Sequence, residues 1–249
     1  MIEVKHLSKT FGDRKILDDI SSVFEDGITN LIIGASGSGK STLARSIVGL
    51  VEPEEGEILF DGRDFLKMSR KEQKELRKEI GFLFQGSALF DYMTVAENVR
   101  FPLDILTNLS IKEKEVRVDT VLERVELSHA KALFPSELSG GMKKRVGIAR
   151  AISPRPKYLF CDEPNSGLDP QTSIVIDNLI HDITIEYNIT TLVITHDMNS
   201  VIEIGDHVLF IHKGVNAWEG DKTSILNTEN QNVIDFVYAS EFMKSLRKK

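Results

Sequence analysis

The sequence has little cysteine, no long apolar run and no excess of positive charge. Its one cysteine, Cys161, cannot form a disulfide within the chain or a cysteine-built zinc cluster, which predicts a reducing, cytoplasmic setting. The longest apolar runs, such as 208–211, fall far short of the roughly 20 residues that cross a bilayer, so we expect no membrane span. The N-terminal region shows no secretory pattern. A net charge of −7 disfavours nucleic-acid binding by broad electrostatics.

Strand-like and helix-like segments alternate along the chain, which is typical of an α/β fold. Short apolar runs at 29–33, 158–161, 191–195 and 208–211 have the composition of strands covered on both faces. Each run is followed by a turn with glycine, proline or aspartate. The pattern predicts a parallel central sheet.

Two other regions differ from this alternation. Near the start, Ile2, Val4 and the run 57–60 have the spacing of half-buried strands, which predicts an antiparallel β flank. Between 90 and 151 strand signals vanish, while 112–127 carries apolar residues at helical spacing. This region is predicted to be a helical insertion.

The length of 249 residues fits one large domain and a short tail. We expect a domain over 1–220, with a helical subdomain at about 88–152, and a helical tail over 221–249. The apolar residues that suggest the tail helix are Ile225, Val233, Phe236, Val237, Phe242, Met243 and Leu246, and its basic end holds Lys244, Arg247, Lys248 and Lys249.

A glycine-rich loop follows the first of the predicted core strands. Residues 34–42 match the pattern G-x-x-x-x-G-K-[ST], between the strand 29–33 and a segment with helical apolar spacing. Such a loop turns backbone N–H groups toward phosphate oxygens, and the helix N-terminus adds attraction for negative charge. A chance glycine-serine loop is the alternative, and it requires all these features to coincide. The pattern predicts a P-loop NTPase core. Its nucleotide-binding residues are predicted to be Gly34, Ala35, Ser36, Gly37, Ser38, Gly39, Lys40, Ser41 and Thr42.

Acidic residues at the end of the strand 158–161 complete the chemistry for a nucleoside triphosphate. Lys40 is expected to bridge the β- and γ-phosphates, and Ser41 to hold Mg²⁺, a hard cation that prefers oxygen ligands. Asp162 is the predicted carboxylate on the Mg²⁺ side. Glu163 is predicted to orient or deprotonate the attacking water, because phosphoryl transfer gains most from positioning and charge stabilisation. The alternative is a surface Asp-Glu pair at a helix start.

The segment 138–146, Leu-Ser-Gly-Gly-Met-Lys-Lys-Arg-Val, is similar to the signature motif of ATP-binding cassette (ABC) ATPases. Other ABC-like elements occur in their usual order over nearly the whole chain, around the phosphate loop, the signature and the acidic strand. They are Phe11 before the core strands, Gln85 after a buried strand, a D-loop with Asp169, and His196 after a strand. The resemblance implies a RecA-like core with a parallel sheet, an antiparallel β flank and a helical subdomain.

The resemblance assigns a role to each of these residues. It implies that Phe11 stacks on the adenine, the alternative being a buried structural phenylalanine. Gln85 is implied to reach Mg²⁺ and the attacking water, the alternative being a surface loop amide. His196 is implied to contact the γ-phosphate and Glu163, which its place after a strand favours over a purely structural histidine. ATP and Mg²⁺ are thus the implied cofactors.

Ser139, Gly140 and Gly141 lead into a second helix whose N-terminus could bind phosphate. In ABC proteins the signature of one subunit closes over the nucleotide held by the other. The resemblance therefore implies a head-to-tail pair of two copies with two shared sites. Asp169 is expected at the subunit junction, the alternative being a plain turn before Pro170.

Met142 occupies the position where ABC signatures commonly have glutamine, and its thioether cannot donate the hydrogen bonds of an amide. With the Lys-Lys-Arg that follows and the segment 83–103, it resembles ATPases of lipid transporters with MCE-domain partners, the maintenance-of-lipid-asymmetry (Mla) and organic-solvent-resistance group. That resemblance implies phospholipid cargo, permease subunits, an MCE-domain lipid-binding protein as a partner and a peripheral place on the cytoplasmic face of the inner membrane. The segment also has the composition of a docking surface, or of packing between insertion and core. Its apolar residues are Leu89, Phe90, Tyr92, Met93, Val99 and Phe101.

Two alternatives stay open from the sequence. A soluble ABC ATPase of DNA repair or translation is disfavoured, because the chain lacks a second cassette, a long coiled-coil insertion and zinc-binding cysteines. We therefore expect no nucleic-acid partner. An ABC transporter of another cargo, such as an amino acid, a metal chelate or a lipoprotein, is the second alternative, since the cassette itself does not touch the cargo.

Overall fold

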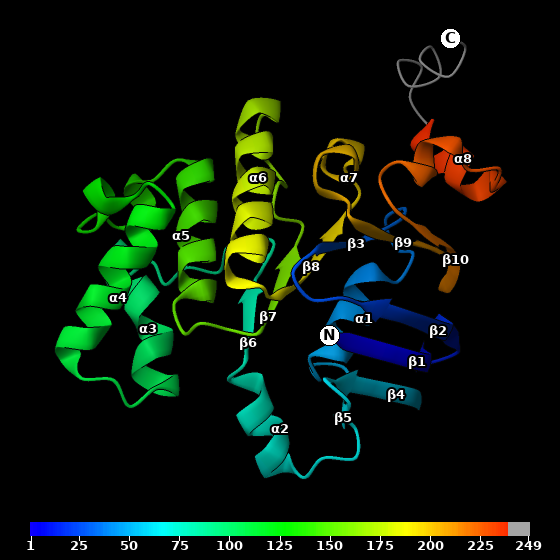
Figure 1. Ribbon diagram of the computed structural model, residues 1–249, viewed down its shortest axis with the longest axis horizontal. Coiled ribbons are helices and arrows are strands. Elements are labelled where there is room, and N and C mark those ends of the chain that lie inside the picture. Colours follow the sequence, from blue (N-terminus) through cyan, green and yellow to red (C-terminus); the bar gives the residue numbers. More distant parts are fainter. Residues whose placement is uncertain (239–249) are drawn as a thin grey trace.

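The computed structural model shown in Figure 1 describes residues 1–238. Several residues predicted for the helical tail lie outside the described residues, and they are Phe242, Met243, Lys244, Leu246, Arg247, Lys248 and Lys249. Within 1–238, none of the helices combines the length and the apolar character needed to cross a bilayer.

Two β-sheets form the framework of the fold. The first is antiparallel, in the order β2-β1-β4-β5, and its strands are β1 (Ile2–Phe11), β2 (Arg14–Phe24), β4 (Glu55–Phe60) and β5 (Arg63–Asp64). The second has the order β10-β9-β3-β8-β7-β6. Its strands are β3 (Thr29–Ile33), β6 (Ile80–Leu83), β7 (Tyr158–Asp162), β8 (Thr190–Thr195), β9 (His207–His212) and β10 (Val215–Gly220).

The central sheet is parallel from β9 to β6, and only the edge strand β10 is antiparallel to its neighbour. All four apolar runs that predicted core strands are strands of this sheet, so the predicted α/β class with a parallel centre and an antiparallel flank is confirmed. The sequence did not predict β2 or β10. Both mix polar and apolar residues and are only partly buried, so they lack the continuous apolar run of a covered strand.

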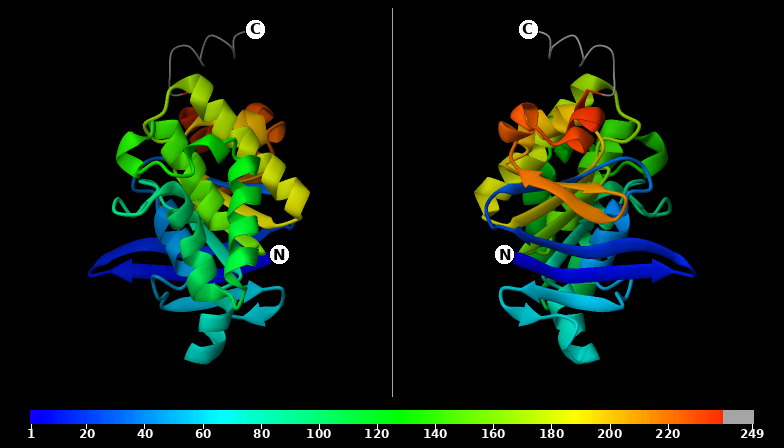
Figure 2. Two further views of the ribbon diagram at one scale, coloured as in Figure 1. Left: turned by 90° about the vertical axis from the view of Figure 1, so that its left-hand side faces the viewer. Right: turned by 90° about the vertical axis from the view of Figure 1, so that its right-hand side faces the viewer.

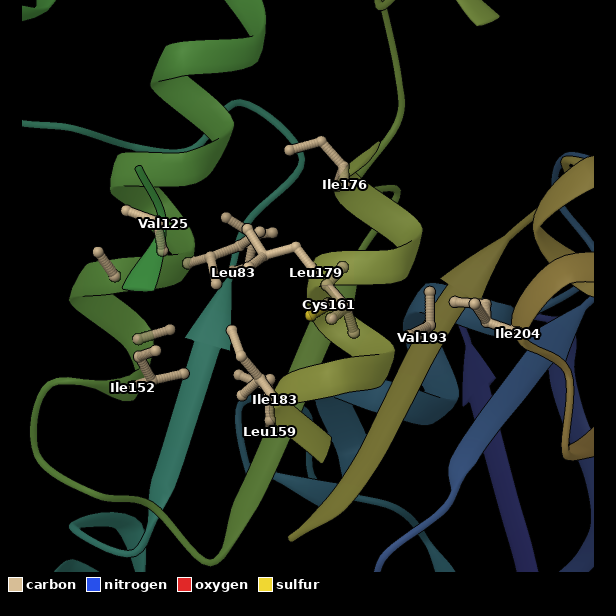
Figure 3. Close-up of a cluster of buried hydrophobic side chains, with 14 of the residues drawn as sticks. Leu83, Val125, Ile152, Leu159, Cys161, Ile176, Leu179, Ile183, Val193 and Ile204 are labelled. Atoms are coloured by element: carbon tan, nitrogen blue, oxygen red, sulfur yellow. The ribbon is translucent and has the colours of Figure 1, made fainter. Parts of the chain in front are cut away.

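Alternate side chains of the central strands enter two separate cores. On one face, Leu159, Cys161 and Val193 pack in a core that includes residues of α6 (Pro170–Tyr187), as Figure 3 shows. On the other face, the neighbouring residues Phe160 and Leu192 pack with α1 (Lys40–Ile47) and the antiparallel sheet. This two-sided burial follows from the period of two along a strand and explains why these strands are apolar throughout.

Helices cover both faces of the central sheet. The longer ones are α1 (Lys40–Ile47), α2 (Arg70–Arg77), α3 (Val95–Leu106), α4 (Ile111–Arg124), α5 (Gly140–Ile152), α6 (Pro170–Tyr187), α7 (Met198–Ile204) and α8 (Gln231–Val237). Short 3₁₀ turns occupy Ser128–Ala130, Pro135–Glu137 and Ser224–Asn227. In Figure 1, α3, α4 and α5 stand together at one side of the molecule, with α6 next to α5.

The region predicted to be a helical insertion contains α3, α4 and α5 and no strand. Capping boxes fix the starts of α3 and α4, in which Thr94 pairs with Glu97 and Ser110 pairs with Glu113. The helical spacing of apolar residues and the local caps thus explain why this stretch forms helices and adds no strand to the sheet. The bounds proposed for this subdomain and for the tail stay a prediction.

The described part of the predicted tail packs on the body of the chain. Val233 and Val237 of α8 are buried in the core beside α6 and β9, and the Phe236 ring lies 5.3 Å from the Phe210 ring. These three side chains therefore contact their own chain.

Candidate functional site

The loop 34–42 joins β3 to α1 in a conformation that requires glycine. Gly34, Gly37 and Gly39 have φ values of 147°, 76° and 112°, which L side chains rarely adopt. A Cβ on Gly34 would lie 2.2 Å from the Ile211 carbonyl oxygen, so the loop is also pressed against the end of β9. Since Gly39 caps α1 without a side chain, the first-turn N–H groups of α1 stay open to a ligand.

Lys40 folds back across this loop. Its Nζ donates to the carbonyl oxygens of Gly34 at 2.9 Å and Ala35 at 3.1 Å, and the residue is 7% exposed. Burial lowers the pKa of the Lys40 ammonium, while the carboxylates of Glu163 and Asp162 oppose that shift. A buried cation thus lies at the mouth of the loop, where an anion would replace its carbonyl partners.

The end of β7 brings oxygen ligands to the phosphate loop. The Ser41 hydroxyl donates to Asp162 Oδ1 at 3.3 Å, and Arg45 Nη2 lies 3.9 Å from Asp162 Oδ2. Among residues 1–238, no group of three or more His, Cys, Asp or Glu side chains is arranged to hold a metal ion by itself. A hydroxyl, a carboxylate and phosphate oxygens together fit Mg²⁺, so the donor set suits a metal that arrives with a nucleotide.

Glu163 and His196 meet at the ends of β7 and β8. His196 Nδ1 lies 2.8 Å from Glu163 Oε2, and the Glu163 N–H donates to the Ile194 carbonyl oxygen at 2.9 Å. Glu163 has a φ of 49°, a left-handed conformation that costs a non-glycine residue of order 1 to 3 kcal/mol. The strained backbone turns this carboxylate toward the histidine, and the structure therefore joins two residues that the sequence placed 33 positions apart.

Gln85 contacts the loop that follows Glu163. Its Nε2 donates to the Ser166 hydroxyl oxygen at 3.4 Å, and the backbone carbonyl oxygen of Gln85 accepts a hydrogen bond from Lys144 Nζ. Lys144 also donates to the Glu163 carbonyl oxygen at 3.2 Å, although it comes from α5. The sequence reasoning missed Lys144. The only feature of the sequence that could have indicated Lys144 is its position on the same face of α5 as the buried Gly141 and Ile148.

Phe11 lies at the tip of the long β1–β2 hairpin, which Figure 2 shows projecting from the body. Its ring is 51% exposed, with Lys9 Nζ 5.1 Å from the ring centroid. The alternative of a buried structural phenylalanine is therefore wrong. Further along the same hairpin, Ile16 and Leu17 lie against Gly39 of the phosphate loop.

The signature residues and Asp169 form a second group. Ser139 caps α5 by accepting a hydrogen bond from the Met142 N–H at 3.3 Å, and Asp169 caps α6 by accepting one from the Thr172 N–H at 3.0 Å. A Cβ on Gly141 would lie 2.6 Å from Thr172 Cγ2, so the two helix starts touch. Hydrogen bonds donated by the Thr172 hydroxyl and N–H hold the pKa of Asp169 below its usual range. Within residues 1–238, no hydrogen bond or ion pair joins this group to the phosphate loop.

The apolar stretch after Gln85 divides between surface and core. A groove of about 370 Å³ is lined by Phe82, Phe84, Phe90, Phe101, Pro102 and Leu106, together with parts of α5. Tyr92 is 74% exposed, whereas Val99 is fully buried and Leu89 packs on the core. For Val99, which faces the core from α3, the alternative of packing between insertion and core is therefore the correct one.

Comparison with known proteins identifies the family. Residues 17–166 match the ABC transporter family. The chain belongs to this family. Like its relatives, it is an ABC transporter ATP-binding subunit and an ATPase, and the predicted family and fold are confirmed.

Individual relatives are similar over most of the chain. The intermembrane phospholipid transport system ATP-binding protein MlaF of Haemophilus influenzae is 40% identical over 95% of this chain and 90% of its own length. The methionine import ATP-binding protein MetN of Desulfitobacterium hafniense is 41% identical over 99% of this chain and 72% of its own. The solved dimeric, post-hydrolysis ATP-binding cassette MJ0796, bound to ADP and phosphate, superimposes with a TM-score of 0.81 at 31% identity, over 89% and 99% of the two chains.

Proposed function

We propose that this chain powers phospholipid transport by hydrolysing Mg-ATP as a head-to-tail dimer on a membrane permease. The observation that carries the hydrolytic part is the Glu163–His196 pair, which lies beside a P-loop whose lysine and serine face Asp162. The likeness to the phospholipid transport protein MlaF supports the cargo.

In this proposal each chain's phosphate loop binds ATP. Lys40 would exchange its loop carbonyls for phosphate oxygens, and Ser41, Asp162 and Gln85 would hold Mg²⁺, which would supply charge neutralisation at the phosphates. Glu163 orients the attacking water, and His196 fixes the Glu163 carboxylate and contacts the γ-phosphate. The exposed ring of Phe11 stacks on the adenine.

The dimer is proposed because the phosphate loop and the signature are separate within one chain, so that a second copy is needed to bring them together. Ser139, Gly140 and Gly141 form a helix start that contacts the D-loop side of its own chain and leaves backbone N–H groups for an anion. A second copy, related by a twofold axis, places this helix start over the ATP of the first, with Asp169 at the junction. The dimeric form of the MJ0796 cassette supports this arrangement.

A permease is the proposed occupant of the aromatic groove between β6 and α3. Phe84, Phe90 and Phe101 present apolar surface there, directly after Gln85 of the hydrolytic site. An apolar segment of a membrane subunit would bury these rings, and a movement of Gln85 would be transmitted to it through them. With this docking, the chain is proposed to lie on the cytoplasmic face of the inner membrane, and an MCE-domain lipid-binding protein is proposed as a further partner.

Affinity purification from detergent-solubilised membranes tests the transport proposal. We expect a multi-span permease and an MCE-domain protein to accompany the chain, and Phe84→Ser with Phe90→Ser to lose them. The exposed Ile185→Ser on α6, away from the groove, is the matched control. Recovery of a methionine-binding protein instead would favour a methionine importer, the function named for the MetN relative. Recovery of nucleic acid without a permease would favour a soluble ABC ATPase.

A further inference from the structure

A buried polar cluster lies behind the Glu163–His196 pair. It consists of Asp177 on α6, Asn165 on the loop after Glu163, and Ser200 on α7. Asp177 is 1% exposed, and all three residues are buried in an otherwise apolar layer. Asn165 Nδ2 donates to the Ser200 hydroxyl oxygen at 3.1 Å, which ties the loop to the helix.

The cluster connects both arms of the hydrolytic site. Asn165 follows Glu163 by two residues, and Ser200 lies four residues after His196, in the first part of α7. Backbone hydrogen bonds make the loop compact, because the Ser166 N–H donates to the Glu163 carbonyl oxygen and the Leu168 N–H to that of Asn165. A movement of Asn165 relative to Ser200 therefore moves Glu163 relative to His196.

The cluster lacks one hydrogen-bond donor. Asp177 Oδ1 and Asn165 Oδ1 are both buried, and neither has a hydrogen-bond partner. Two unpaired acceptors in an apolar layer are costly, whereas a proton on the Asp177 carboxyl supplies the missing donor. The geometry thus contains a place for one proton, and whether that proton is present changes how firmly the loop is held.

We propose that Asp177 is a positioning residue of the hydrolytic site. Through Asn165 and Ser200 it holds the loop that carries Glu163 against the helix that follows His196, and its neutral form holds the loop most firmly. The proposal rests on the roles assigned above to Glu163 and His196.

The charges around Asp177 favour its neutral form. The pKa of the Asp177 carboxyl is raised to about 6, chiefly by burial; the neighbouring Ser200 hydroxyl and Asn165 amide oppose this shift, and the charges of Asp197, which caps α7, and Glu203 on α7 add to it. On β7, the thiol of Cys161 faces the same carboxyl, and burial, followed by the charge of Asp177, raises its pKa so that it stays protonated. Asp177 therefore loses its proton between about pH 5 and pH 7, and above that range it is charged and the loop is held less firmly.

Steady-state hydrolysis by purified Asp177→Ala and Asp177→Asn chains tests the proposal. We expect Asp177→Ala to lower kcat roughly ten- to a hundredfold, because the carboxylate and histidine lose their mutual position, with KM for ATP within about twofold. Asp177→Asn supplies a neutral donor and is expected to restore kcat to within about threefold of the wild type at pH 5.5. Thr184→Val, which removes another buried hydroxyl of α6, is the matched control and should leave kcat unchanged.

The pH dependence separates positioning from simple loss of fold. The ratio of the Asp177→Asn rate to the wild-type rate should rise about threefold between pH 5.5 and pH 8, since titrations common to both chains cancel in the ratio. A flat ratio together with an Asp177→Ala kcat within twofold of the wild type would overturn the proposal, as would an Asp177→Asn rate as low as that of Asp177→Ala. A wild-type rate no higher than that of Glu163→Gln would instead overturn the function proposed for Glu163, and this proposal with it.

Discussion

The starts of α1 and α5 are two helix N-termini with glycine-rich approaches, and they differ in what surrounds them. At α1, the buried Lys40 and the carboxylates at the end of β7 meet in one place. At α5, Ser139 caps the helix with its own hydroxyl, and the nearest side chains, Leu168 and Thr172, belong to the D-loop region. The first end has the groups for chemistry, whereas the second offers only amides and a helix dipole. In the proposed dimer, each chain therefore supplies the hydrolytic half of one site and the closing half of the other.

The largest effect is expected from a substitution that removes the carboxylate of Glu163, near the start of α1, while keeping the shape of the side chain. Glu163→Gln retains the hydrogen bond to His196 but cannot orient or deprotonate water as a carboxylate does. We expect hydrolysis to fall about 10²- to 10⁴-fold, with ATP affinity within about twofold. A phosphate-release assay and a fluorescent-nucleotide titration measure both. A hydrolysis rate equal to that of the wild type would contradict the role of Glu163.

A large effect is also expected at the α5 end, where no catalytic group lies. Ser139→Arg removes the cap of α5 and fills the space that the partner's nucleotide is proposed to occupy. We expect hydrolysis to fall at least about tenfold, while each chain still binds ATP at its own phosphate loop. Ser139→Ala, which loses only the cap, is the control and should be the milder variant. Equal activity of Ser139→Arg and wild type would show that α5 does not close over ATP.

The smallest expected effect lies at the hairpin tip. Phe11→Ala removes a ring that stacks on adenine in the proposal, and aromatic contacts of this kind contribute about 0.5 to 1.5 kcal/mol. The KM for ATP should rise roughly two- to tenfold with kcat unchanged. Phe11→Tyr should behave like the wild type, while an unchanged KM in Phe11→Ala would remove Phe11 from the site.

The central sheet could be predicted from the sequence because burial on both faces leaves a continuous apolar run, as in β7 and β8. The phosphate loop was predictable for a different reason, since its conformation demands glycine at fixed spacing. Strand β2 was not predictable in this way, because its polar and apolar residues alternate irregularly around register shifts.

Contacts between distant segments were the part of the site that the sequence did not predict. Lys144 reaches the carbonyl oxygens of Gln85 and Glu163, which are 59 and 19 positions away. Asp177 meets Asn165 and Ser200 only because α6 and α7 pack together over the sheet. No local sequence pattern indicates such contacts, because they depend on how distant elements pack.

Mixing two inactive variants tests most directly whether the α1 end of one chain works with the α5 end of another. Lys40→Ala loses the phosphate loop and Ser139→Arg loses the signature, so each should be inactive alone. In an equal mixture, about half of the pairs are mixed and each has one intact site, which predicts recovery of up to about a quarter of the wild-type rate. Hydrolysis that stays at the level of the separate variants, with mixed pairs shown to form, would contradict the shared site.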